Sequence, residues 1–86
     1  MVAASDRGAD YKRLVGALGK KVRDERMRLG YTQEQLAVKA GFHRTYIGMV
    51  ERGEQNVTLE SCCRFADALD MRVYDLLLYT LRDMGT

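Results

Sequence analysis

The chain has no proline, only two cysteines and no hydrophobic run long enough to cross a membrane. The lack of proline, with strong helix formers spread over all 86 residues, favours an all-α fold. Cys62 and Cys63 are neighbours, so on a helix they point in different directions and a mutual disulfide is not expected. We interpret both as small core hydrophobes. The first ten residues lack the apolar centre of a signal peptide, so we expect a cytoplasmic protein with no membrane partner.

The residue patterns of enzymes and metal sites are also missing. The single histidine, His43, has no nucleophile or carboxylate at a useful spacing, and the chain has no glycine-rich phosphate loop. No cluster of His, Cys, Asp or Glu has the spacing of metal ligands. We therefore expect no catalytic residue, no metal and no cofactor, and we expect that the protein is not an enzyme.

What the chain does have is a polarised distribution of charge. Residues 1–52 carry 11 Lys and Arg against 6 Asp and Glu, a net charge of +5. Residues 53–86 carry 3 against 6, a net charge of −3. A basic half suits a polyanionic partner, with the acidic half facing away from it. A solvated basic face explains the same numbers, so charge alone leaves both readings open.

Length and composition indicate one small domain. With 47% hydrophobic residues, a chain of this size can build a core but has little of it to spare. We expect a flexible arm over residues 1–10 and a single domain over residues 11–86. The arm could lie on DNA through Arg7, or it could simply be disordered.

A first helix is predicted over residues 11–29. Its apolar stripe, at three- and four-residue spacing, consists of Val15, Leu18, Val22 and Leu29. Gly30 is placed to end this helix. Gly16 and Gly19 weaken its first half by about 1 kcal/mol each relative to Ala, so the firm part is expected from residue 18 onward.

Residues 32–52 predict two short helices joined by a tight turn. Thr32 and Gln35 have the spacing of a capping box, which starts a helix directly after Thr32. Gly41 can adopt the left-handed conformation that ends it, and His43 stands at the N-cap of the next helix. So short a connection forces the helices to cross steeply. This is the geometry of a helix-turn-helix, whose second helix presents its early exposed residues to base edges in the major groove.

Arg26 interrupts the apolar stripe of the first helix and therefore needs an acidic partner. Glu51, at the end of the second helix of the pair, is the candidate. A buried contact between the two would tie the first helix to the helix that faces DNA. We expect this ion pair to be structural.

The C-terminal third predicts two more helices, one capped by Thr58 and one over residues 73–83. The inward side of the fourth helix is expected to contain Leu59, Cys62, Cys63, Phe65, Ala66 and Leu69. The last helix is apolar on more than one face, which a domain this small cannot bury, so we expect it to pack on a second copy of the chain. The predicted dimer interface consists of Leu76, Leu77, Tyr79 and Leu81.

These residues together resemble the Cro and phage-repressor (XRE-like) helix-turn-helix family of transcription regulators. The matching positions are Arg26, the run from Gly30 to Ala37, Gly41, Tyr46, Ile47 and the run from Val50 to Gly53. Within that family the chain is similar to the controller proteins of restriction-modification systems, on the run from Arg44 to Ile47, the run from Glu51 to Glu54, Asn56 and Thr58. The resemblance implies a compact five-helix, lambda-repressor-like domain.

The resemblance also implies roles for single residues. Arg44 and Thr45 match base-reading positions, where a guanidinium can hold guanine and a threonine can contact thymine. Gly48 and Met49 take outward positions where many relatives carry polar readers, so Met49 is included as a reader and DNA deformation is expected to add specificity. The expected contacts to the DNA backbone are Gln33, His43, Tyr46, Arg52 and Asn56. For His43, plain capping is the alternative to a phosphate contact.

The implied function is that of a homodimeric, sequence-specific transcriptional regulator. It would bind a palindromic operator in double-stranded DNA and control a restriction-modification operon and its own gene, with RNA polymerase as a further candidate partner. The alternative is an antitoxin-type interaction module with autoregulatory DNA binding, whose last helix masks a toxin. A stable dimer of the purified protein would favour the regulator, and a monomer with exposed apolar surface would favour the missing partner.

Overall fold

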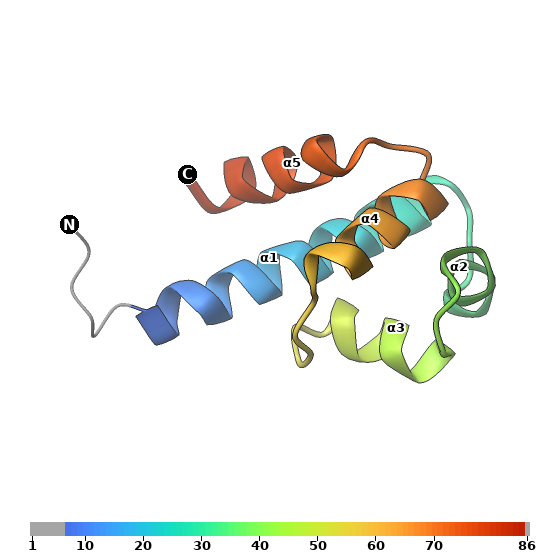
Figure 1. The fold of residues 1–86 in the computed structure, drawn as a ribbon, viewed down its shortest axis with the longest axis horizontal. Helices are drawn as coiled ribbons and strands as arrows, with labels where there is room; N and C mark the ends of the chain where they lie inside the picture. The colour runs from blue at the N-terminus through green and yellow to red at the C-terminus, as the bar shows by residue number, and fades with distance from the viewer. Residues whose placement is uncertain (1–6, 86) are drawn as a thin grey trace.

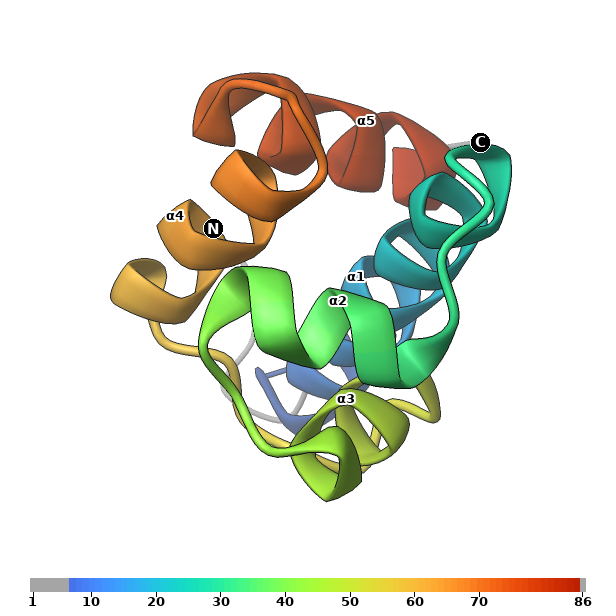
Figure 2. The same cartoon turned by 90° about the vertical axis from the view of Figure 1, so that its right-hand side faces the viewer.

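The computed structural model describes residues 7–85, and five α-helices make up most of that range (Figure 1). In chain order they are α1 (Arg7–Arg28), α2 (Gln33–Ala40), α3 (Arg44–Glu51), α4 (Leu59–Ala68) and α5 (Val73–Gly85). No strand occurs among the described residues, and the predicted all-α fold is confirmed. The long helix α1 lies between α3 on one side and α5 on the other, as Figures 1 and 2 both show.

Helix α1 begins four residues earlier than predicted. Residues 7–10 are helical, so the helix start predicted at residue 11 was wrong. Asp10 lies in the first turn, where a negative charge is favourable to the helix dipole. Arg13 Nη2 donates a hydrogen bond of 3.0 Å to the carbonyl oxygen of Met84, which joins the first half of α1 to the end of α5. Residues 1–6 and the side chain of Arg7, which we expected could reach DNA, lie outside the described residues.

Gly19 is where α1 crosses the end of α3. A Cβ placed on Gly19 would come within 2.0 Å of the carbonyl oxygen of Val50, so only glycine allows the two backbones to lie this close. A Cβ on Gly16, in contrast, would meet no atom within 4 Å. One of the two glycines that weaken α1 is therefore required by packing, and the other is not.

The core lies where α1 to α5 converge. It consists of Leu18, Val22, Leu36, Ala37, Ala40, Ile47, Val50, Cys62, Phe65, Ala66, Ala68, Leu69 and Leu76. Two residues predicted to face it from α4 do not. Leu59 is 74% exposed because it is the first residue of α4, and Cys63 is exposed because it points away from its buried neighbour Cys62. The interpretation of both cysteines as core residues holds for Cys62 alone.

Helix α5 is apolar on two sides, and the structure separates them. Leu76 is 0% exposed and packs in the core of its own chain, so its prediction as a dimer-interface residue was wrong. The reason is helical phase: Leu76 and Thr80 lie one turn apart on the buried side, where the Thr80 hydroxyl donates to the carbonyl oxygen of Leu76 at 2.8 Å. Leu77 is half-buried, and Tyr79 and Leu81 are exposed. No helix within residues 7–85 combines the length and the apolar character that a membrane span requires.

Candidate nucleic-acid interface

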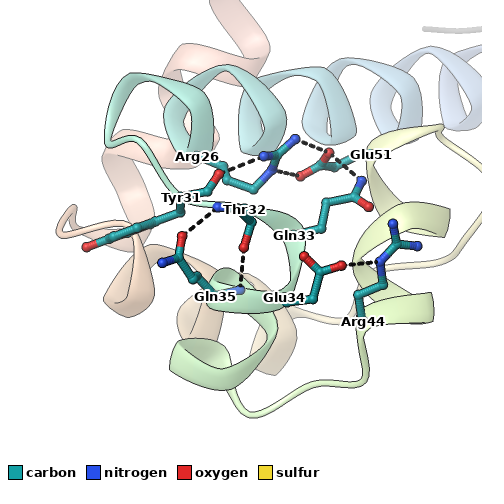
Figure 3. A network of polar contacts seen from close by, with 8 residues as sticks. All are labelled: Arg26, Tyr31, Thr32, Gln33, Glu34, Gln35, Arg44 and Glu51. Atoms are coloured by element: carbon teal, nitrogen blue, oxygen red, sulfur yellow. Dashed lines mark hydrogen bonds and ion pairs between the residues drawn. The ribbon is translucent and has the colours of Figure 1, made fainter.

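The first helix of the predicted pair, α2, is set by its caps. Thr32 Oγ1 accepts a hydrogen bond of 3.1 Å from the backbone N–H of Gln35, and Gln35 Oε1 accepts one of 2.8 Å from the N–H of Thr32 (Figure 3). This is the predicted capping box, which satisfies two amides at the start of the helix. Gly41 ends α2 with φ of +76°, and its N–H donates to the carbonyl oxygen of Ala37. Local chemistry thus defines both ends of α2.

The second helix, α3, begins at an exposed histidine. His43 has the extended backbone of an N-cap residue, φ −72° and ψ 145°, but its side chain makes no capping hydrogen bond. The first-turn N–H groups of α3 therefore have no side-chain acceptor from His43. They carry the positive end of the helix dipole to the surface.

The predicted base readers Arg44 and Thr45 lie side by side in the first turn of α3, and both are exposed. Arg44 is not free of contacts. Its Nε donates a hydrogen bond of 2.9 Å to Oε1 of Glu34, at the start of α2 (Figure 3). The pKa of the Glu34 carboxyl is below its ordinary value, because its own backbone amide and then Arg44 donate hydrogen bonds to it. Glu34 was not among the predicted site residues, because an acidic residue at the second position of a helix is common enough to give no separate signal.

The other outward positions of α3 are less open than predicted. Met49 is half-buried and Gly48 is buried, so the outward placement of Gly48 was wrong. The reason is that the Arg52 side chain folds back along the helix: a Cβ on Gly48 would lie 3.1 Å from Arg52 Nη1. Among the predicted base readers, the exposed side chains are therefore those of the first turn.

The residues predicted to contact the DNA backbone differ in their exposure and in the contacts that their side chains already make. His43, Arg52 and Asn56 are exposed, and Arg52 Nε lies 3.1 Å from Oε2 of Glu54. Gln33 is half-buried, and its side-chain amide donates to Oε1 of Glu51 at 3.1 Å, which leaves its backbone N–H at the start of α2 as the group that can face a phosphate.

Tyr46 joins the interface to the core. Its ring packs on Phe42 with 4.7 Å between ring centroids and lies 6.2 Å from the ring of buried Phe65. Its hydroxyl donates to the carbonyl oxygen of Asn56 at 3.4 Å, in the loop that follows α3. Tyr46 therefore holds this loop beside α3 in addition to any contact with DNA.

An ion pair fixes the place of α3. Arg26 of α1 donates to Glu51 at the end of α3 through two hydrogen bonds, Nε to Oε2 at 2.7 Å and Nη2 to Oε1 at 3.0 Å. Its Nη1 donates to the carbonyl oxygen of Tyr31 at 2.8 Å, so Arg26 also holds the chain that leads into α2 (Figure 3). The exposed first turn of α3 is thus carried on a helix clamped at its other end.

The chain is similar in sequence to a known family and to proteins of known name. The helix-turn-helix family matches residues 22–76. Control protein C.SmaI of Serratia marcescens is 50% identical over 60 residues, which cover 70% of this chain and 71% of that protein. Control protein C.BamHI of Bacillus amyloliquefaciens is 41% identical over 63 residues, which cover 72% and 78%.

Solved structures show the same arrangement of helices. The restriction-modification controller protein C.AhdI of Aeromonas hydrophila has a TM-score of 0.70 and 39% identity, over 72% of this chain and 94% of that chain. C.Esp1396I bound to a 25 base pair operator site has a TM-score of 0.78 and 26% identity, over 85% and 96%.

Proposed function

The chain belongs to the helix-turn-helix family, and from this we propose that it is a sequence-specific DNA-binding transcriptional regulator. One observation carries the proposal: Arg44 and Thr45 stand exposed at the first turn of α3, on a helix whose far end is clamped by Arg26 and Glu51. A rigid helix that presents a guanidinium and a hydroxyl at its leading end suits insertion into a major groove.

Direct readout is assigned to three residues. Arg44 donates two hydrogen bonds to O6 and N7 of a guanine, and Thr45 contacts a base through its hydroxyl or its methyl group. Half-buried Met49 offers apolar contact to a thymine methyl from the same face. Because Gly48 adds no side chain, sequence-dependent deformation of the DNA supplies the remaining specificity.

Contacts to the DNA backbone flank the readers. Exposed Arg52, Asn56 and His43 surround α3, and the backbone N–H of Gln33 lies at the positive end of α2. The Tyr46 hydroxyl is positioned at the loop that contains Asn56. These groups orient the protein on the duplex without choosing its sequence.

The active form is proposed to be a homodimer. Helix α5 leaves apolar side chains exposed, and α3 lies on the opposite side of α1, so a dimer formed through α5 leaves both copies of α3 free (Figures 1 and 2). The interface is assigned to Leu77, Tyr79 and Leu81, together with exposed Leu78. Each α3 would enter one half-site of a palindrome, with half-sites about 34 Å apart.

The regulated genes are proposed from the relatives. The two relatives with 50% and 41% identity are called control proteins. Of the two structural neighbours, C.AhdI is a restriction-modification controller protein and C.Esp1396I is bound to an operator site. We assign this chain the same task, namely control of a restriction-modification operon that includes its own gene. The likeness covers at least 70% of the chain in these sequence matches.

The direct test is selection of bound duplexes from a random pool, followed by sequencing. The expected result is a palindrome whose half-sites are one helical turn apart. Arg44→Ala serves as the matched variant, because it should lose the preference at one base pair in each half-site and keep the rest. A pool from which no sequence is enriched would contradict the proposed function. If the wild type and Arg44→Ala selected the same palindrome, the assignment of Arg44 as a base reader would be wrong.

A further inference from the structure

The contact between Glu34 and Arg44 is an ion pair in the part of the surface assigned to base reading. Both side chains are more than half exposed, at 64% and 57%, so the pair contributes little to the stability of the fold. Its partners belong to different helices, α2 and α3, and lie ten residues apart in sequence. Such a contact favours one position of the Arg44 side chain before any DNA arrives.

The geometry of the pair leaves the recognition edge of Arg44 open. Glu34 is bonded to Nε, and within residues 7–85 neither terminal nitrogen of Arg44 makes a hydrogen bond (Figure 3). A guanine is held by two parallel N–H groups of one guanidinium, on O6 and N7. With Nε occupied, Nη1 and Nη2 form the pair of donors that remains for a base.

The negative charge of Glu34 also favours contact of Arg44 with a base over contact with a phosphate. Attraction to phosphate supplies nearly all of non-specific DNA binding, and an exposed arginine next to a helix N-terminus would bind phosphate readily. The carboxylate of Glu34 neutralises the charge of Arg44, so this guanidinium attracts a phosphate less strongly. An exposed glutamate is ionised at neutral pH, and hydrogen bonds from its own amide and from Arg44 lower the pKa of this carboxyl further.

We propose that Glu34 is a positioning residue that sets the specificity of DNA recognition. It holds Arg44 by Nε with both terminal nitrogens directed at a guanine, and it opposes capture of Arg44 by phosphate. The inference rests on the proposed function, because it requires that Arg44 reads a base.

A matched control exists elsewhere in the chain. Glu60 is the second residue of α4 and follows the capping residue Thr58, just as Glu34 follows the cap Thr32 in α2. It is exposed, and no ion pair joins it to another described residue. Glu60→Gln therefore changes the charge and the helix terminus in the same way as Glu34→Gln, without touching Arg44.

The experiment measures binding of purified protein to three duplexes by fluorescence anisotropy. They are the selected operator, the operator altered at the base pair whose preference Arg44→Ala abolishes, and an unrelated duplex. Glu34→Gln should lower discrimination between the first two by about threefold, the range expected for loss of an exposed ion pair, and should tighten binding to the unrelated duplex. Glu60→Gln should leave the discrimination unchanged.

Two further variants separate position from charge. Glu34→Asp keeps the charge but shortens the reach, so it should lower discrimination while leaving affinity for the unrelated duplex near that of wild type. In the Arg44→Ala background, Glu34→Gln should have no further effect on discrimination at that base pair. Circular dichroism melting checks that each variant folds.

The outcomes distinguish the two proposals. A wild-type protein that selects a palindrome, with unchanged discrimination in Glu34→Gln, would overturn the role of Glu34 and leave the regulator intact. An equal loss in Glu60→Gln would also overturn it, because the effect would then be one of general charge. A wild-type protein that selects no sequence would overturn the proposed function itself, and with it the role of Glu34.

Discussion

Arg26 and Glu51 join α1 to the end of α3 through two hydrogen bonds of 2.7 and 3.0 Å, and their side chains are only 12% and 4% exposed. Gln33 donates to the same carboxylate from α2, so three helices meet at one buried charge. The orientation of the proposed recognition helix therefore depends on a contact at the end of α3 opposite to its exposed first turn.

Removing one member of the Arg26–Glu51 pair should lower the stability of the fold. Glu51→Ala is expected to lower the free energy of unfolding by about 3–5 kcal/mol, because Arg26 is left charged and buried without its partner. Urea denaturation followed by circular dichroism measures the change. Arg28→Ala, which removes an exposed partner of Glu25, should cost less than about 1 kcal/mol. A loss below about 1 kcal/mol for Glu51→Ala would show that the pair is not structural.

The two glycines of α1 should respond in opposite directions to the same substitution. Gly16→Ala is expected to raise the free energy of unfolding by about 0.5–1 kcal/mol, because alanine favours the helix and the new Cβ meets no atom. Gly19→Ala should lower it, because the Cβ would lie 2.0 Å from the carbonyl oxygen of Val50 and push α1 from α3. Thermal melting of the two variants measures the difference. Equal shifts in melting temperature would contradict the close approach of α1 and α3 at Gly19.

Arg44 and Arg52 should differ in how they affect DNA binding. Arg44→Ala is expected to cost about 1–3 kcal/mol on the operator and to relax specificity at one base pair per half-site. Arg52→Ala should weaken binding to all sequences alike and lower the salt slope by about one per protomer, because it removes the phosphate contact proposed for Arg52. Titrations at several salt concentrations distinguish them, and a sequence-dependent effect of Arg52→Ala would reverse its assignment.

Substitutions on the exposed side of α5 should affect the proposed dimer, and substitutions on its buried side should affect folding. Leu81→Ser, at a side chain that is 55% exposed, is expected to convert the dimer to a monomer with little change in helix content. Leu76→Ala should instead lower the free energy of unfolding by about 2–5 kcal/mol, because Leu76 is fully buried in its own chain. Sedimentation velocity gives the mass, and Val38→Ser on α2 is the control for loss of an exposed apolar side chain. A wild-type monomer would favour an apolar partner of another kind on α5, as in the antitoxin hypothesis.

The N-cap of α3 offers a gain of stability. His43→Ser should raise the free energy of unfolding by about 0.5–1 kcal/mol, because serine can accept a hydrogen bond from a first-turn amide that His43 leaves uncapped. Thr32→Ala, which removes the existing cap of α2, should lower it by about 1 kcal/mol. Chemical denaturation of both variants tests the pair, and a loss of stability in His43→Ser would mean that the histidine has a structural role.

Much of the fold could be predicted because its signals are local. The capping box of Thr32 and Gln35 and the left-handed Gly41 lie within one helix length, so the start and end of α2 follow from adjacent residues. The contact of Arg26 with Glu51 spans 25 residues, yet it was predictable because a charged residue in an apolar stripe demands a partner. The start of α1 was not predictable in this way, because residues 7–10 carry no apolar periodicity that would mark a helix.

The helix pair, the glycine turn and the two side chains at the start of α3 follow from the amino-acid sequence alone, because caps, turns and helical periodicity act between near neighbours. Three features follow from the packing of the helices instead: Leu76 is buried while Leu81 is exposed, Gly19 must lack a side chain, and Arg44 is bonded to Glu34. The reason is that each of these depends on how closely and at what angle two helices pack, and periodicity along one helix does not contain that information.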